Sequence, residues 1–288
     1  MSPRSIVLAG SFLLASLAVG CAAPTDSEDV ASGEGAITQA AHAAKVKACI
    51  ATQDRALEKA VAQNAMNQAV FAARDCIAKA NDKTIANIEK NAKEIGSPNV
   101  GQVKAQFQAF RDAYGEACQV IADAGDNAGG SLGRLEQAGC LRDREATLAA
   151  LIDAYVDLGA EGIAIPEDKA AFPQCYADFD KAAEAASNGN EERAAAYGLS
   201  ECVVKAADAL APDLAKRTLE SFPDRKLADV EAAAHAAFAK MSDATATVCG
   251  TLADASDNRG GTLSRLYGAS CQTDGAAQLV QLAKSFTQ

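Results

Sequence analysis

Eight of the nine cysteines in this 288-residue chain form two sets of four with matching spacing, and this pattern restricts the fold more than any other feature. The first interval is 27 residues in both sets and the last is 22 in both, whereas the middle interval is 42 in one and 47 in the other. Matched spacing indicates an internal duplication, and cysteines kept in step indicate disulfides. The sets are Cys49, Cys76, Cys118 and Cys140, then Cys175, Cys202, Cys249 and Cys271.

Each pair of cysteines taken in sequence order is centred on residues typical of a turn. The midpoints fall within 62–65, 126–130, 187–190 and 257–261, and the last three segments are rich in Asn and Gly. Partners that face each other across an antiparallel helical hairpin lie equally far from its turn. The sequence therefore predicts four local disulfides: Cys49–Cys76, Cys118–Cys140, Cys175–Cys202 and Cys249–Cys271.

The apolar periodicity is helical in both halves of the chain. Phe107, Phe110 and Tyr114 step by three and four residues, and so do Ala234, Phe238 and Met241. We therefore predict an all-α protein, with two tandem disulfide-stapled helical-hairpin domains related by internal duplication. The predicted repeats are residues 41–160 and 161–288.

The N-terminus is typical of an exported lipoprotein. Residues 1–20 combine Arg4 with an uncharged apolar run that is too short for a membrane-spanning helix. Small residues precede Cys21, as in a bacterial lipobox, so we expect Cys21 to carry the lipid; the alternative is an ordinary secreted protein. Residues 21–40 are predicted to form a flexible acidic tether. The expected location is the cell envelope, at the outer membrane if the cell is diderm, facing a compartment that preserves disulfides.

The acidic charge limits the choice of partner. The chain has a net charge of −11, and the signal removes only the positive Arg4, which makes the mature protein −12. This argues against binding to nucleic acid or to anionic lipid and suits a basic partner. The alternative is that the acidity simply keeps an envelope protein in solution.

We expect neither catalysis nor a cofactor. His42 and His235 are the only histidines and do not occupy matching positions, so a nucleophile–histidine site is poorly supported. The cysteines are too far apart in sequence for the usual zinc motifs. The sequence therefore predicts no enzyme and no metal site.

The best-matched segments of the two repeats are 118–140 and 249–271, which are identical at 13 of 23 positions. Both carry two Asp and one Asn before a Gly-Gly pair. An EF-hand calcium loop would need a different ligand pattern. Capping of a helix end is one role for these residues, and contact with a basic partner is the other. The candidate partner-binding residues are Asp123, Asp126, Asn127, Asp254, Asp257 and Asn258. Arg134 and Arg265 also recur, and we expect each to bond a loop Asp or a helix-end carbonyl.

The first repeat resembles the LprI-like lysozyme-inhibitor family. The similar segments are 76–82, 107–112 leading to Cys118, and Gly129-Gly130-Ser131 leading to Cys140, Arg144 and Leu148. Phe107 replaces the family's Trp, and Ser242 stands where the second repeat would match Arg111. The resemblance implies an exported helical binding protein that inhibits lysozyme; the alternative is a structural or scaffolding envelope lipoprotein. An acidic patch beside a groove would favour inhibition, whereas loop acids neutralised by local Arg would favour scaffolding.

Overall fold

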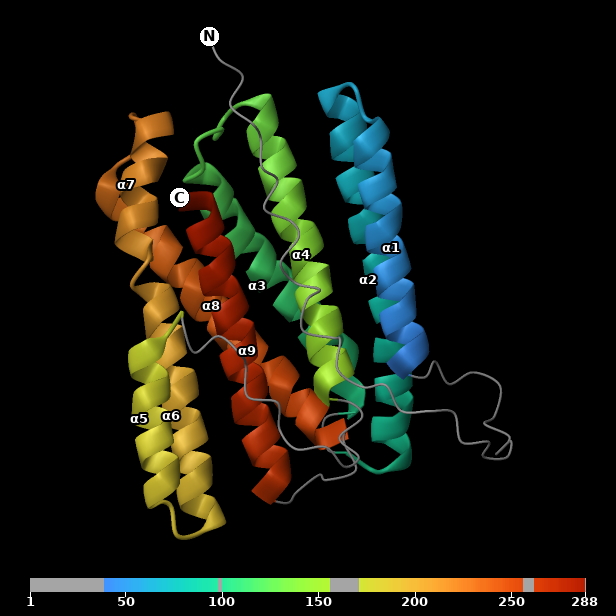
Figure 1. The fold of residues 1–288 in the computed structure, drawn as a ribbon, viewed down its shortest axis with the longest axis vertical. Coiled ribbons are helices and arrows are strands. Elements are labelled where there is room, and N and C mark those ends of the chain that lie inside the picture. The colour runs from blue at the N-terminus through green and yellow to red at the C-terminus, as the bar shows by residue number, and fades with distance from the viewer. Residues whose placement is uncertain (1–38, 98–99, 156–170, 256–261, 288) are drawn as a thin grey trace. The chain divides into compact units, whose positions relative to one another are not determined.

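All the regular structure that the computed structural model describes is helical, which confirms the all-α prediction for these residues (Figure 1). The described residues are 39–97, 100–155, 171–255 and 262–287. The frequent alanines favour helix, since alanine has the highest intrinsic helix propensity. The first half comprises α1 (Gln39–Lys59), α2 (Gln63–Glu94), the short 3-10 helix η2 (Val100–Gln102), α3 (Val103–Asp123) and α4 (Ser131–Tyr155). The second half comprises α5 (Pro173–Ala185), α6 (Gly189–Asp208), α7 (Ala211–Ser221), α8 (Leu227–Ala255) and α9 (Thr262–Thr287).

The helices contact one another in the same order in the two halves. In the first half α2 packs on α1 and on α4, and α4 also packs on α3. In the second half α6 packs on α5 and on α9, and α9 also packs on α8. The halves meet mainly through α3 and α8, with a smaller contact between α4 and α9.

Four disulfides staple neighbouring helices at the pairs that the turn-centred spacing predicts. Cys49–Cys76 joins α1 to α2, and Cys118–Cys140 joins α3 to α4. Cys175–Cys202 and Cys249–Cys271 join the corresponding helices of the second half. The Cα atoms of each pair are 5.6–5.7 Å apart, which is the usual separation in a disulfide.

The halves differ most clearly after their second helix. In the first half α2 continues for 32 residues, whereas the matching stretch of the second half is divided into α6 and α7. Pro212 lies in the first turn of α7, where its missing N–H costs little but where it cannot continue a preceding helix. The break turns α7 onto α8 and α3.

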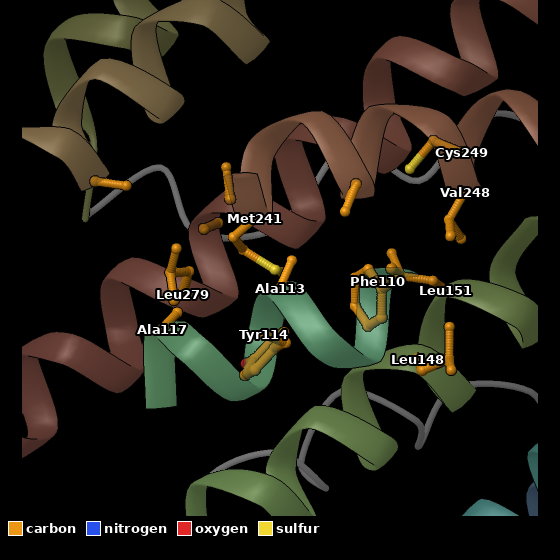
Figure 2. Close-up of a cluster of buried hydrophobic side chains, with 14 of the residues drawn as sticks. Phe110, Ala113, Tyr114, Ala117, Leu148, Leu151, Met241, Val248, Cys249 and Leu279 are labelled. Atoms are coloured by element: carbon orange, nitrogen blue, oxygen red, sulfur yellow. The ribbon is translucent and has the colours of Figure 1, made fainter. Parts of the chain in front are cut away.

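The main core lies where α3 meets α8. Phe110 and Ala113 of α3 are fully buried, and Figure 2 shows Met241 of α8 directed at Ala113. Alanines such as Ala113 and Ala117 let the two backbones approach closely. This apolar cluster includes residues from Ile85 to Ala283 and so draws on both halves. A boundary between domains at residue 160 stays a prediction, and the core is continuous across it.

Candidate functional site

The loop between α3 and α4 contains the first group of predicted contact residues. The chain reverses at Gly129, whose φ of +74° suits glycine, and Gly130 donates its N–H to the carbonyl of Asn127. A Cβ added at Gly133 would lie 2.7 Å from that same carbonyl oxygen. The glycines therefore allow the loop to fold tightly onto the first turn of α4.

Both predicted aspartates of this loop form ion pairs with arginines of the second half. Arg225 donates to the Asp123 carboxylate at 2.6 Å, and Arg217 donates to Asp126 at 2.8 Å. Asn127 donates to Glu136 within its own half at 2.6 Å. The two arginines balance the charge of the two aspartates, so this loop presents little net negative charge.

Apolar and further polar contacts hold the same loop region against the second half. A Cβ at Gly129 would lie 3.4 Å from the Phe222 ring, and the guanidinium of Arg225 stacks 4.2 Å from the centroid of that ring. Glu116 of α3 pairs with Lys240 of α8 in the adjoining interface. The first predicted contact loop is thus part of the joint between the halves.

The second group of predicted contact residues is only partly described. Asp254 is half-buried near the C-terminal end of α8 and has a partner. Asp257 and Asn258 lie outside the described residues, as does Cys21. The side chain of Arg265 is likewise not described.

A polar cavity of about 370 Å³ lies beside the first loop. Arg134 lines it and forms no ion pair with any residue that the structure describes, so of the two expected partners the loop Asp is not the one found. Both loop aspartates pair with other arginines, Asp126 with Arg217 and Asp123 with Arg225. Amide and guanidinium groups together can bind carboxylates or hydroxyls. The other lining residues are Gln63, Asn64, Asn67, Gly129 and Gly130.

The most elaborate polar arrangement in the described residues is a buried ion cluster that sequence reasoning missed. Glu145 of α4 is fully buried and accepts from two arginines. Arg111 donates to its Oε2 through Nε at 3.2 Å and Nη2 at 3.0 Å. Arg144 donates to its Oε1 through Nε at 3.1 Å and Nη2 at 2.8 Å. Burial alone would lower the pKa of Arg111, but attraction to Glu145 and hydrogen bonds to Asp82 and Glu145 raise it above the usual value.

The cluster extends across four helices. Asn81 of α2, also fully buried, donates to Glu145 Oε2 at 3.1 Å and to the Glu145 carbonyl at 2.9 Å. Its Oδ1 lies 3.0 Å from Nε2 of His42 on α1. Arg111 also pairs with Asp82 at 2.7 Å. Because Glu145, Asn81 and His42 are buried and their polar atoms bond within the cluster, its main effect is to orient the helices, and only Asp82 at its edge is largely exposed.

Only part of this cluster left a signal in the sequence. Arg111 and Arg144 belong to segments that resemble the LprI-like family, but the resemblance does not identify Glu145 as their shared partner. Glu145 looks like an ordinary surface charge until α2, α3 and α4 are packed together. The two histidines do not meet in a shared site: His42 contacts Asn81, and His235 contacts Asp208 at 2.6 Å.

Two further features of the described residues concern metal binding and membrane insertion. Their Cys, His, Asp and Glu side chains form no group of three or more that could hold a metal ion. None of the described helices combines the length and apolar character needed to cross a membrane. Comparison with protein-family models, curated proteins and solved structures finds no match to this chain.

Proposed function

We propose that this chain is an exported, lipid-anchored binding protein of the cell envelope with a structural or scaffolding role. The observation that carries this choice is the neutralisation of Asp123 and Asp126 by arginines of the second half. A loop whose acids already pair with arginines of the same chain attracts a basic enzyme less strongly, although Asp126 itself is 81% exposed. The same ion pairs help to fix the relative position of the two halves.

The matching halves support an origin by duplication, which we include in the proposal. The disulfides recur with separations of 27 and 22 residues in each half. The order of helix contacts recurs as well. Duplication gives a protein two related surfaces whose side chains can diverge, and the ion cluster of the first half is one such divergence.

Lysozyme inhibition is the second candidate, and one observation favours it. Acidic side chains are exposed along the α5–α6 hairpin, including Asp178, Glu184, Glu192 and Glu201. Together with the net charge of the chain, they would attract a basic enzyme. Contact through α5 and α6 would leave the first loop in its internal joint.

The two candidates separate in a paired experiment on residues 21–288 with Cys21→Ala. Scaffolding predicts that crosslinking in envelope extract captures a partner and that c-type lysozyme keeps full activity at every salt concentration. Inhibition predicts a loss of lysozyme activity that weakens as salt rises, because exposed charges are screened beyond about 10 Å at 0.1 M ionic strength. Inhibition by this fragment, without further substitutions, would overturn the preference for scaffolding.

Charge-reversal variants then locate the surface that binds the enzyme. Asp178→Lys with Glu184→Lys should abolish inhibition if α5 carries the contact. Asp126→Lys with Asp257→Lys should abolish inhibition if the loops contact the enzyme. Glu34→Lys in the tether is the control. Circular dichroism must show the same helicity in every variant.

The lipid anchor has its own test. Metabolic labelling with a fatty acid should mark the wild-type protein and leave Cys21→Ala unlabelled. Equal labelling of both would contradict acylation at Cys21.

A further inference from the structure

The second half contains a cavity at the place where the first half contains its buried ion cluster. Counting from the disulfide cysteines, Ser242 matches Arg111, Gly275 matches Arg144 and Ala276 matches Glu145. Ala207 likewise matches Asn81. All four of these smaller residues line one cavity of about 260 Å³ between α6, α8 and α9.

The walls of this cavity are mainly apolar. Phe238 and Met241 of α8 and Leu279 of α9 are almost fully buried and line it. Thr245 donates its hydroxyl to the Met241 carbonyl at 2.8 Å, so that its polar atom is already bonded. Its methyl carbon Cγ2 would lie 2.5 Å from a Cβ at Gly275, so position 275 has no room for a side chain like that of the matching Arg144.

The mouth of the cavity carries hydrogen-bond donors. Lys205 is exposed, lines the cavity and forms no ion pair with any described residue. The half-buried Ser242 and Gln272 lie beside it, and Gln272 uses its Oε1 to accept from Ser200. Among the described residues that line the cavity, Asp208 carries the only carboxylate, and it is bonded to His235 at 2.6 Å.

We propose that this cavity binds a small amphiphile with an apolar chain and a carboxylate head, such as a medium-chain fatty acid. Packed interiors contain few voids larger than a water molecule, and an engineered apolar cavity of about 150 Å³ admits benzene. A cavity of about 260 Å³ is larger than that and slightly smaller than the pockets of drug-sized ligands. The apolar walls would bury the chain, and Lys205 with Ser242 would bond the carboxylate. The inference is independent of the scaffolding role.

Titration calorimetry with sodium octanoate tests the proposal on detergent-free residues 21–288 with Cys21→Ala. Residues 37–288 form one compact unit, so removal of the signal leaves the cavity intact. We expect one molecule bound per chain and a higher midpoint of thermal unfolding. Acetate, which lacks the chain, and octylammonium, which reverses the head charge, should not bind.

Three variants decide whether binding occurs in this cavity. Lys205→Glu should weaken octanoate binding at least about tenfold, because it removes a charge-assisted hydrogen bond. Ala207→Leu should abolish binding by filling the cavity. Lys181→Glu on α5 changes the net charge equally but lies outside the cavity lining, so it should bind like the wild type.

The proposal fails if octanoate does not bind the wild type, or if folded Ala207→Leu binds it equally well. Octylammonium binding as tight as that of octanoate would overturn the assignment of the head group. Should Ala207→Leu fail to fold, Ser242→Leu at the mouth provides the same test. Lysozyme activity and partner capture are separate readouts, so failure here leaves the proposed function untouched.

Discussion

Replacing Glu145 by Gln should destabilise the protein far more than any surface substitution of the same kind. The side chain is fully buried and accepts from Arg111, Arg144 and Asn81. The Arg111 and Arg144 side chains are themselves only 13% and 16% exposed, so neither charge can reach water freely once its partner is neutral. The amide would also direct N–H donors at guanidinium donors.

The magnitude follows from the cost of leaving buried charges unpaired. Breaking a buried pair by removing one partner costs about 3–5 kcal/mol. Asp82 still neutralises part of the Arg111 charge, so we expect about 3 kcal/mol. For a chain of this size each kcal/mol lowers the unfolding midpoint by about 2–4 °C, which makes the total roughly 10 °C.

Urea unfolding followed by circular dichroism, with the disulfides intact, measures this loss. Glu94→Gln is the matched control, because it removes the same charge from an exposed ion pair, in which Glu94 Oε1 lies 3.9 Å from Lys90 Nζ. It should change stability by less than about 0.5 kcal/mol. A loss below about 1 kcal/mol for Glu145→Gln would refute the view that the cluster is a tightly coupled buried unit.

Three further predictions concern the local structure. Asn188→Ala should cost about 1 kcal/mol, because Asn188 Oδ1 caps α6 by accepting from two backbone N–H groups; chemical unfolding measures it, and no loss would contradict the cap. Hydrogen bonds from the Ser187 N–H and hydroxyl lower the pKa of Glu191, so their stabilising effect is present above the unfolded-state pKa of about 4.3 and is lost as the pH falls through the folded value. As the pH is lowered, the free energy of unfolding should therefore fall less steeply in Glu191→Gln than in the wild type, and identical curves would contradict this. Replacing both Cys118 and Cys140 by Ala opens a loop of 22 residues and should lower the free energy of unfolding by about 3–4 kcal/mol. Chemical unfolding of the oxidised wild type and of the variant measures this difference, and a loss under about 1 kcal/mol would contradict it.

The joint between the halves explains why separating them should be costly. Phe110, Met241 and Val248 are buried between α3 and α8, which belong to different halves (Figure 2). Isolated halves would expose this contact, because the main core is shared by the two predicted repeats, 41–160 and 161–288.

The sequence by itself determined the helices and the disulfide partners. Both are local properties: periodicity of three and four residues defines a helix face, and each disulfide closes a hairpin around a nearby turn. Three turns fall close to the predicted centres, at 60–62, 124–130 and 186–188, and the fourth lies outside the described residues. The alanine-rich composition favours helix, and the regular structure of the described residues is helical throughout.

Only the tertiary structure decided how charged and small residues combine. Glu145, Arg111 and Asn81 are far apart in sequence, and each alone resembles a solvated polar residue of a helix. Burial changes their role, because charges removed from water must find partners. Ala207, Ser242 and Gly275 are equally inconspicuous in sequence, and they line a cavity only because α6, α8 and α9 bring three small residues to one place. The same is true of Asp123 and Asp126, whose neutral surroundings depend on arginines about 90 to 100 residues away.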